Sequence, residues 1–129
     1  INKAVWKETK EKHEFFLSDD FGDSSMVKIK NYEKIINVKT CTLDDIISDL
    51  KKIKLIKIEA EGCEFEALLG LKDNINKVEY IVIDVGFERG IDQQSTLKEC
   101  TNLLLQNNFE IIAFRLERLV FLYKNTSFH

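Results

Sequence analysis

The sequence predicts an α/β fold, in which strands and helices alternate around a parallel sheet. Alternating large apolar residues at positions 55–60 predict one strand, and a nearly continuous apolar run at positions 78–86 predicts a second. Such a continuous run is typical of a strand covered on both faces, as in a parallel sheet flanked by helices. Between the two, Phe65, Leu68 and Leu69 lie at helical spacing, so the chain contains a strand, turn, helix and strand in succession.

Helices are predicted on either side of this unit. Thr42 can cap the first one, and a single apolar stripe follows it at helical spacing. The stripe consists of Leu43, Ile46, Ile47, Leu50 and Ile53. Ser95 can cap the second helix, which should end at 107–108, two asparagines that readily adopt a left-handed backbone. Beyond it, the apolar segments 109–114 and 119–123 predict a terminal antiparallel hairpin.

The first 39 residues show strand patterns without helices. They predict a hairpin over 1–17, a loop rich in Ser, Asp and Gly over 18–25, and strands over 27–30 and 35–39. A chain of 129 residues fits a single domain. We expect residues 1–39 to form a hairpin and strand insertion, and residues 40–129 to form a β/α core.

Composition disfavours several classes of function. A hydrophobic content of 44% with 32% charged residues is typical of a soluble globular protein, and a net charge of -3 argues against a nucleic-acid binder. No apolar run approaches the length needed to span a membrane. The three cysteines show no C-x-x-C spacing and only two histidines are present, so we expect no zinc site and assign no metal ligands. Cysteines of this kind are typical of reduced thiols, and we expect a cytoplasmic protein.

Acidic residues gather where the two central strands are predicted to end. Glu59 and Glu61 follow the first strand, and strand alternation would place them on one face. Glu64 begins the next helix, where an acid also favours the helix dipole. Asp84 interrupts the second strand near its end and should either meet a partner or face a ligand crevice. Because ligands bind at the carboxyl ends of strands in open α/β sheets, this edge is the candidate site.

Three segments together have the pattern of a known family. They are T-L-D-D at 42–45, L-I-K-I-E-A-E-G-C-E at 55–64 and L-L-G at 68–70. In order and spacing they resemble the later half of the FkbM-type S-adenosylmethionine-dependent methyltransferases, which usually have aspartate at the position of Glu59. The resemblance implies a Rossmann-like class I methyltransferase sheet in truncated form, with the later strands, their helices and the terminal antiparallel hairpin.

The resemblance also implies an activity, the transfer of a methyl group from S-adenosylmethionine to a hydroxyl of a small molecule or glycan. Sugars, lipid-linked glycans and polyketides are the acceptors it suggests. Glu59 and Glu61 would be catalytic, as proton acceptor or hydroxyl-orienting groups. Substrate-binding residues would be Glu64, Asp84, Arg89 and Ser25, and cofactor-binding residues would be Asn2 and Ala4. Arg89 has the alternative of pairing with Glu88 or Asp92.

A class I methyltransferase binds its cofactor through a glycine loop after its first strand. The five glycines of this sequence form no G-x-G. We therefore expect the C-terminal portion of a methyltransferase domain, inactive by itself, with the cofactor loop located before Ile1. In the sheet order 3-2-1-4-5-7-6 that the resemblance implies, the strand at 55–60 would then be an exposed apolar edge. From this we expect a homodimer or a swapped assembly.

Two alternatives stay open on the sequence. Glu59 and Glu61 could hold magnesium in a metal-dependent phosphodiesterase or nuclease. The chain could also be a non-catalytic Rossmann-like module that serves assembly.

Overall fold

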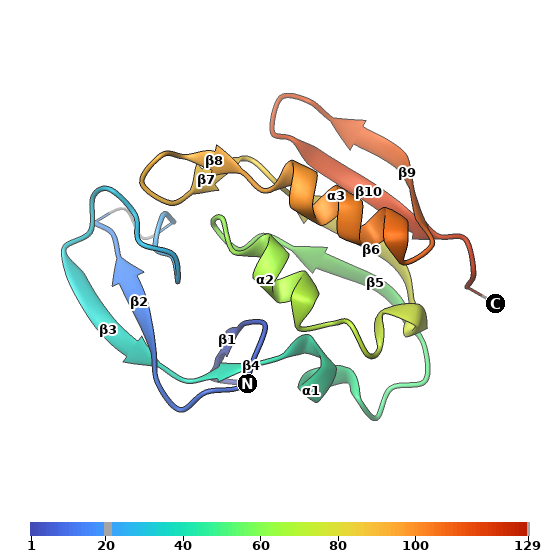
Figure 1. The fold of residues 1–129 in the computed structure, drawn as a ribbon, viewed down its shortest axis with the longest axis horizontal. Helices are drawn as coiled ribbons and strands as arrows, with labels where there is room; N and C mark the ends of the chain where they lie inside the picture. The colour runs from blue at the N-terminus through green and yellow to red at the C-terminus, as the bar shows by residue number, and fades with distance from the viewer. Residues whose placement is uncertain (20–21, 129) are drawn as a thin grey trace.

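A four-stranded sheet forms the centre of the computed structural model, which describes residues 1–19 and 22–128 (Figure 1). Its strands are β5 (Ile53–Ile58), β6 (Val78–Asp84), β10 (Val120–Asn125) and β9 (Phe109–Arg115), in that spatial order. β5 and β6 run parallel, and β10 runs antiparallel to both β6 and β9. The structure thus confirms the predicted parallel pair and the terminal hairpin. The order corresponds to strands 4, 5, 7 and 6 of the expected sheet.

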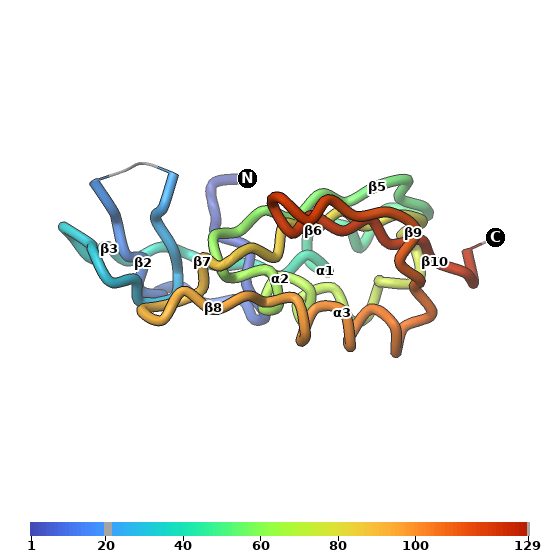
Figure 2. Tube along the Cα trace, turned by 90° about the horizontal axis from the view of Figure 1, so that it is seen from above, coloured from blue at the N-terminus to red at the C-terminus, as the bar shows by residue number. Residues whose placement is uncertain are grey.

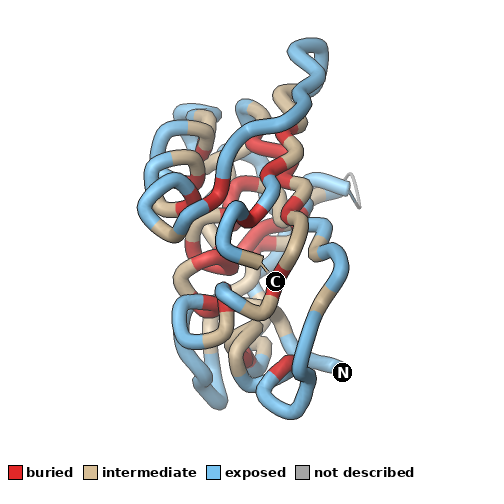
Figure 3. Tube along the Cα trace, turned by 90° about the vertical axis from the view of Figure 1, so that its right-hand side faces the viewer, coloured by how far each residue is buried: buried red, intermediate tan, exposed pale blue. Residues whose placement is uncertain are grey.

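Two helices cover the same side of this sheet. They are α2 (Glu64–Leu69) and α3 (Leu97–Gln106), both below the sheet in Figure 2. Fully buried side chains of the core come from the helices, the strands and the segments between them: Leu68, Leu71, Ile81, Ile83, Val85, Leu104 and Tyr123. Figure 3 shows buried positions gathered in the middle of the molecule. Apolar spacing in the sequence therefore identified both helices but not the whole of their buried faces, since α2 also buries Glu64 and Glu66 and Leu105 on α3 is 51% exposed.

The first helix, α1 (Leu43–Ile47), begins as predicted but is shorter than its apolar stripe suggests. The Thr42 hydroxyl accepts from the Asp45 amide at 3.0 Å, and the Asp45 carboxylate accepts from the Thr42 amide at 3.2 Å, which forms a capping box. The helix ends before Leu50, which is half exposed, and Ile53 is already the first residue of β5. Apolar spacing alone does not distinguish a third helical turn from a turn that leads into a strand.

The predicted hairpin over residues 1–17 is wrong. β1 (Ala4–Val5) pairs in parallel with β4 (Thr40–Cys41), whereas β2 (His13–Leu17) pairs antiparallel with β3 (Lys34–Val38). The strand segments were recognised, but their partners lie 17 to 36 residues away in the chain, which alternation of apolar residues does not reveal.

Two other segments differ from the sequence prediction. Residues 27–30 form no strand; Met26 instead packs with Trp6 and Cys63 in a small buried cluster. The predicted loop over 18–25 includes residues 20 and 21, which lie outside the described residues, and its Ser25 forms an isolated bridge with Phe16. Met26 and Ser25 are thus placed by contacts with residues outside their own segments, which a local sequence pattern does not reveal.

After β6 the chain forms a short ribbon. The ribbon consists of β7 (Phe87–Arg89) and β8 (Gln94–Ser95), and it precedes α3. Thr96 is the N-cap residue of α3, although the Ser95 hydroxyl accepts from the Leu97 amide at 3.1 Å. Asn108, after the helix, has a φ of 63°, as the two asparagines predicted. A 3₁₀ helix, η1 (Ile75–Lys77), joins the turn after α2 to β6.

β5 lies at one edge of the sheet. Among the described residues it pairs only with β6, and the Leu55 side chain on it is 52% exposed. The exposed apolar edge that the sequence predicted is therefore present in this chain. None of the helices in the described ranges is long and apolar enough to cross a membrane.

Candidate acceptor site

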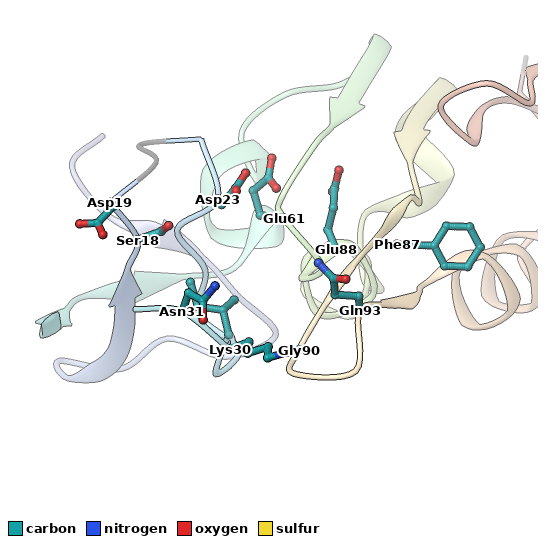
Figure 4. A pocket seen from close by; sticks show the side chains of 11 residues that line it. Ser18, Asp19, Asp23, Lys30, Asn31, Glu61, Phe87, Glu88, Gly90 and Gln93 are labelled. Carbon is teal, nitrogen blue, oxygen red and sulfur yellow. The ribbon is translucent and has the colours of Figure 1, made fainter. Parts of the chain in front are cut away.

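A cavity of about 600 Å³ opens beside the carboxyl end of β5, between the N-terminal segment and the β7–β8 ribbon (Figure 4). Its polar lining comprises the carboxylates Asp19, Asp23, Glu61 and Glu88, together with Ser18, Lys30, Asn31 and Gln93. Phe87, which also lines it, points away from the others in Figure 4. The cavity lies where ligands collect in open α/β sheets, and acids outnumber basic residues in its lining.

Glu61 reaches the cavity because the chain turns sharply after β5. Glu61 and Gly62 both adopt left-handed backbone, with φ values of 47° and 86°. A Cβ on Gly62 would lie 2.5 Å from the Cα of Arg89, so only glycine fits there. The Ser25 hydroxyl, on a buried side chain, donates to the Glu61 carbonyl at 2.8 Å and fixes the turn from the other side.

Glu59 and Glu61 do not share one face as strand alternation suggested, because β5 ends at Ile58 and the backbone turns left-handed at Glu61. Glu61 lines the cavity, and Glu59 is not among the lining residues. The Glu59 carboxylate contacts the ammonium of Lys57 and lies 3.5 Å from Arg118. The hydrogen bond and charge of Lys57, with a contribution from Arg118, lower the pKa of Glu59. Glu59 is therefore a charged group beside the cavity.

Burial and nearby acids raise the pKa of Glu61. The acids that contribute are Asp23, Glu64, Glu59 and Asp84. Figure 4 shows the Asp23 carboxylate next to that of Glu61. In the described part of the chain, no group is seen to donate a hydrogen bond to the Glu61 carboxylate. Its oxygens are available to a ligand in the cavity.

Glu64 and Arg89 hold the turn together. The Glu64 side chain is buried, and its Oε1 accepts from the amides of Ala60 and Gly62, both at 3.0 Å. Its Oε2 accepts from the Thr96 hydroxyl at 2.8 Å. Arg89 donates to the Gly62 carbonyl at 2.6 Å. These contacts account for both residues as supports of the turn, and neither lines the large cavity.

Arg89 pairs with Glu66, a partner that the sequence did not suggest. Its guanidinium binds both carboxylate oxygens of Glu66, at 2.8 and 2.7 Å, and not Glu88 or Asp92. The hydrogen bond and charge of Glu66 raise the pKa of Arg89. Arg89 lines a smaller pocket of about 240 Å³ against α2 and α3.

Asp84 meets a partner near the end of β6. Its buried carboxylate accepts from the Gly86 amide at 3.3 Å and lies 3.4 Å from Arg118.

Ser25 contacts the backbone of the turn through its hydroxyl, which also lies 3.3 Å from the Cys63 sulfur. Burial raises the pKa of the Cys63 thiol, so this cysteine stays protonated at neutral pH.

The two cofactor-binding residues expected from the resemblance lie away from the cavity. Asn2 is exposed near the start of the chain. Ala4 is half-buried and packs against the cluster of Trp6, Met26 and Cys63. Their role stays a prediction.

Glu88 is a further candidate, which the sequence suggested only as a partner for Arg89. It lines the cavity, and burial together with nearby acids raises its pKa to about 7. The sequence held a signal for it, since Glu88 follows the second central strand by only a few residues and therefore lies at the same edge as Glu61. The described residues bring together no group of three or more Asp, Glu, His or Cys side chains able to hold a metal ion.

Comparison with known proteins adds the family. A family model described as "Methyltransferase FkbM domain" matches residues 3–115. Searches of curated proteins and of solved structures gave no significant match to this chain. The family implies a Rossmann-like fold, with which the observed strand order agrees, and the use of S-adenosylmethionine. The match spans most of the 129 residues, and the chain belongs to the FkbM family of methyltransferase domains.

Proposed function

We propose that this chain forms the acceptor side of an S-adenosylmethionine-dependent O-methyltransferase, which methylates a hydroxyl group of a small molecule or glycan. The observation that carries the proposal is the cavity beside β5, where Glu61 presents a carboxylate without a partner among the described residues. This cavity lies within the part of the chain that matches the methyltransferase family.

The lining of the cavity is compatible with a positively charged methyl donor. S-adenosylmethionine supplies a methyl group on a cationic sulfur. Asp23, Glu61 and Glu88 give the cavity a negative potential that attracts a cation, and the charged Glu59 lies nearby. The chain's sequence holds no G-x-G, so its own residues account for only part of a cofactor site.

Methyl transfer to a hydroxyl depends chiefly on alignment of the acceptor. Glu61 is well suited to this task, because Gly62 and Ser25 fix the turn that carries it. A hydroxyl that donates to the Glu61 carboxylate would be held in a defined orientation, with electron density increased on its oxygen. Glu59, paired with Lys57, would act at longer range through its charge.

The proposal is tested with the full-length protein, isotopically labelled S-adenosylmethionine and a panel of polyhydroxylated acceptors. We expect label in at least one acceptor and a loss in kcat/KM of about 100-fold in Glu61→Gln. Glu117→Gln, at an exposed position of the β9–β10 turn, serves as the matched control and should behave as wild type. Absence of transfer to every acceptor, or an unchanged rate in Glu61→Gln, would contradict the proposal.

A further inference from the structure

We propose that Glu88 takes the proton from the acceptor hydroxyl during methyl transfer, while Glu61 orients that hydroxyl from the other side of the cavity. This inference rests on the proposed function and deepens it. Glu88 lies on β7 and Glu61 in the turn after β5, and both line the same cavity. Figure 4 shows the two side chains pointing in the same direction.

The backbone leaves space for the Glu88 carboxylate. A Cβ on Gly86 would lie 3.3 Å from the Oδ1 of Asp84 and 3.4 Å from the Oε1 of Glu88, so the glycine leaves room beside both carboxylates. The Arg89–Glu66 ion pair holds the next residue of β7 against α2. Glu88 is therefore anchored at its backbone, and its carboxylate stays free in the cavity.

The availability of lone pairs distinguishes Glu88 from the paired acids around it. Glu59 forms an ion pair with Lys57, and Glu66 forms one with Arg89. Glu64 accepts from two backbone amides, and Asp84 forms an ion pair with Arg118. In the described ranges, no hydrogen-bond donor or ion-pair partner of the Glu88 carboxylate is found. A general base needs a lone pair that can reach the substrate; Glu88 has one in the cavity, whereas none of the paired acids lines it.

The surrounding charges suit a proton acceptor at neutral pH. Partial burial is the main cause that raises the pKa of Glu88 to about 7, with further contributions from nearby acids. The charged groups that act on it are Glu61 in the turn, Asp84 on β6 and Glu64 on α2, which raise its pKa, and Arg118 between β9 and β10, which lowers it. A base is most effective when its pKa lies near the working pH, because it is then both deprotonated and strongly basic.

The proposed step conserves atoms and charge. As the acceptor oxygen forms its bond to the methyl carbon, the bond from that carbon to the donor sulfur breaks and leaves its electron pair on sulfur. The hydroxyl proton passes to the Glu88 carboxylate. The neutral Glu88 then releases this proton to solvent through the open side of the cavity, and the carboxylate is ready for the next acceptor.

The test compares kcat/KM against pH for the full-length wild type, Glu88→Gln, Glu88→Asp and the control Glu117→Gln. We expect an acidic limb near pH 7 in the wild type and in the control. Glu88→Gln should lose about 100-fold or more and lack this limb, and Glu88→Asp should recover part of the loss because it restores a carboxylate. Thermal melting verifies that each variant is folded.

A second readout does not depend on turnover. The ¹³C NMR signal of the Glu88 carboxyl, assigned by its absence in Glu88→Gln, should titrate near pH 7. Titration near the ordinary value for glutamate, or a Glu88→Gln variant with unchanged rate and pH profile beside an active wild type, would overturn the role of Glu88 alone. A wild type that methylates no acceptor would overturn the proposed function, and this inference with it.

Discussion

Arg89 and Glu66 join β7 to α2 through a two-pronged ion pair, with Nη1 2.8 Å from Oε2 and Nη2 2.7 Å from Oε1. Arg89 also donates to the Gly62 carbonyl at 2.6 Å, so one guanidinium contacts both the helix and the turn after β5. Glu88 directly precedes Arg89, and Glu61 directly precedes Gly62. The ion pair therefore sets the relative position of the two cavity carboxylates.

Removal of the Arg89 guanidinium should destabilise the fold. Glu66 is buried, and Arg89→Ala leaves its charge without a partner, which costs about 3 kcal/mol in comparable pairs. Arg89→Lys should be intermediate, because an ammonium cannot bind both carboxylate oxygens in the same way. Urea unfolding measures these changes. Arg115→Ala, at an exposed position, should differ from wild type by less than about 0.5 kcal/mol, and an equal loss in that control would refute the assignment.

Gly62 should not tolerate a side chain. Its φ of 86° is unfavourable for other residues, and a Cβ would meet the Arg89 backbone at 2.5 Å. Gly62→Ala should therefore lower the free energy of unfolding by at least about 2 kcal/mol. Gly22→Ala is the matched control, since nothing lies within 4 Å of its Cβ position. Similar melting temperatures for the two variants would show that the turn is not constrained as described.

Glu64 should act through the fold. Glu64→Ala leaves two amides and the Thr96 hydroxyl without their acceptor, which should cost about 3 kcal/mol, because each unsatisfied buried donor costs about 1–3 kcal/mol. In Glu64→Gln the amide oxygen can still accept from both backbone N–H groups, so the loss should be about 1 kcal/mol. Chemical denaturation measures both. If Glu64→Ala is as stable as wild type, Glu64 does not hold the turn.

These roles were only partly predictable. The apolar periodicity of β5, α2 and β6 and the acids at the strand ends indicated the sheet and the edge that carries the cavity. The separation of Glu59 from Glu61 was not predictable from alternation, because it results from two successive left-handed residues, and a non-glycine such as Glu61 rarely adopts that conformation. Arg89 pairs with Glu66, 23 residues earlier, and no local pattern reveals that contact.

Glu88 should give the protein a measurable dependence of stability on pH. Its pKa is raised to about 7 in the folded state, above the value of about 4.3 expected when unfolded. Between these values the folded state binds more protons than the unfolded state, so stability falls as pH rises from about 4.3 to about 7 and then levels off.

Glu88→Gln removes this contribution. Relative to wild type, the variant should gain stability as pH rises through the same window, with no further change above it. Urea unfolding at a series of pH values measures the difference. A difference that does not vary with pH between about 4.3 and 7 would show that Glu88 titrates normally in the folded protein.

The β5 edge should promote self-association. Leu55 is 52% exposed on a strand that pairs only with β6 among the described residues, and unpaired apolar edges recruit other strands. We predict a homodimer of this chain in sedimentation at micromolar concentration, weakened by Leu55→Glu. Leu105→Glu, at an equally exposed position on α3, controls for the added charge. A strictly monomeric wild type would contradict the prediction.

The cofactor half of the site was less accessible to sequence reasoning than the acceptor half. Asn2 and Ala4 were assigned by resemblance, and the structure places them outside the cavity, with Ala4 in a cluster formed by contacts remote in sequence. Glu88 was overlooked because an acid next to an arginine suggests a local ion pair, whereas the fold turns Arg89 toward α2 and leaves Glu88 facing the cavity.

The most direct test is a crystal structure of the full-length protein with S-adenosylhomocysteine and an acceptor that it methylates. The account predicts that the acceptor hydroxyl lies in the cavity beside β5, within hydrogen-bonding distance of Glu61 or Glu88, with the sulfur of the cofactor product nearby. An acceptor bound elsewhere, with both carboxylates facing solvent, would contradict it.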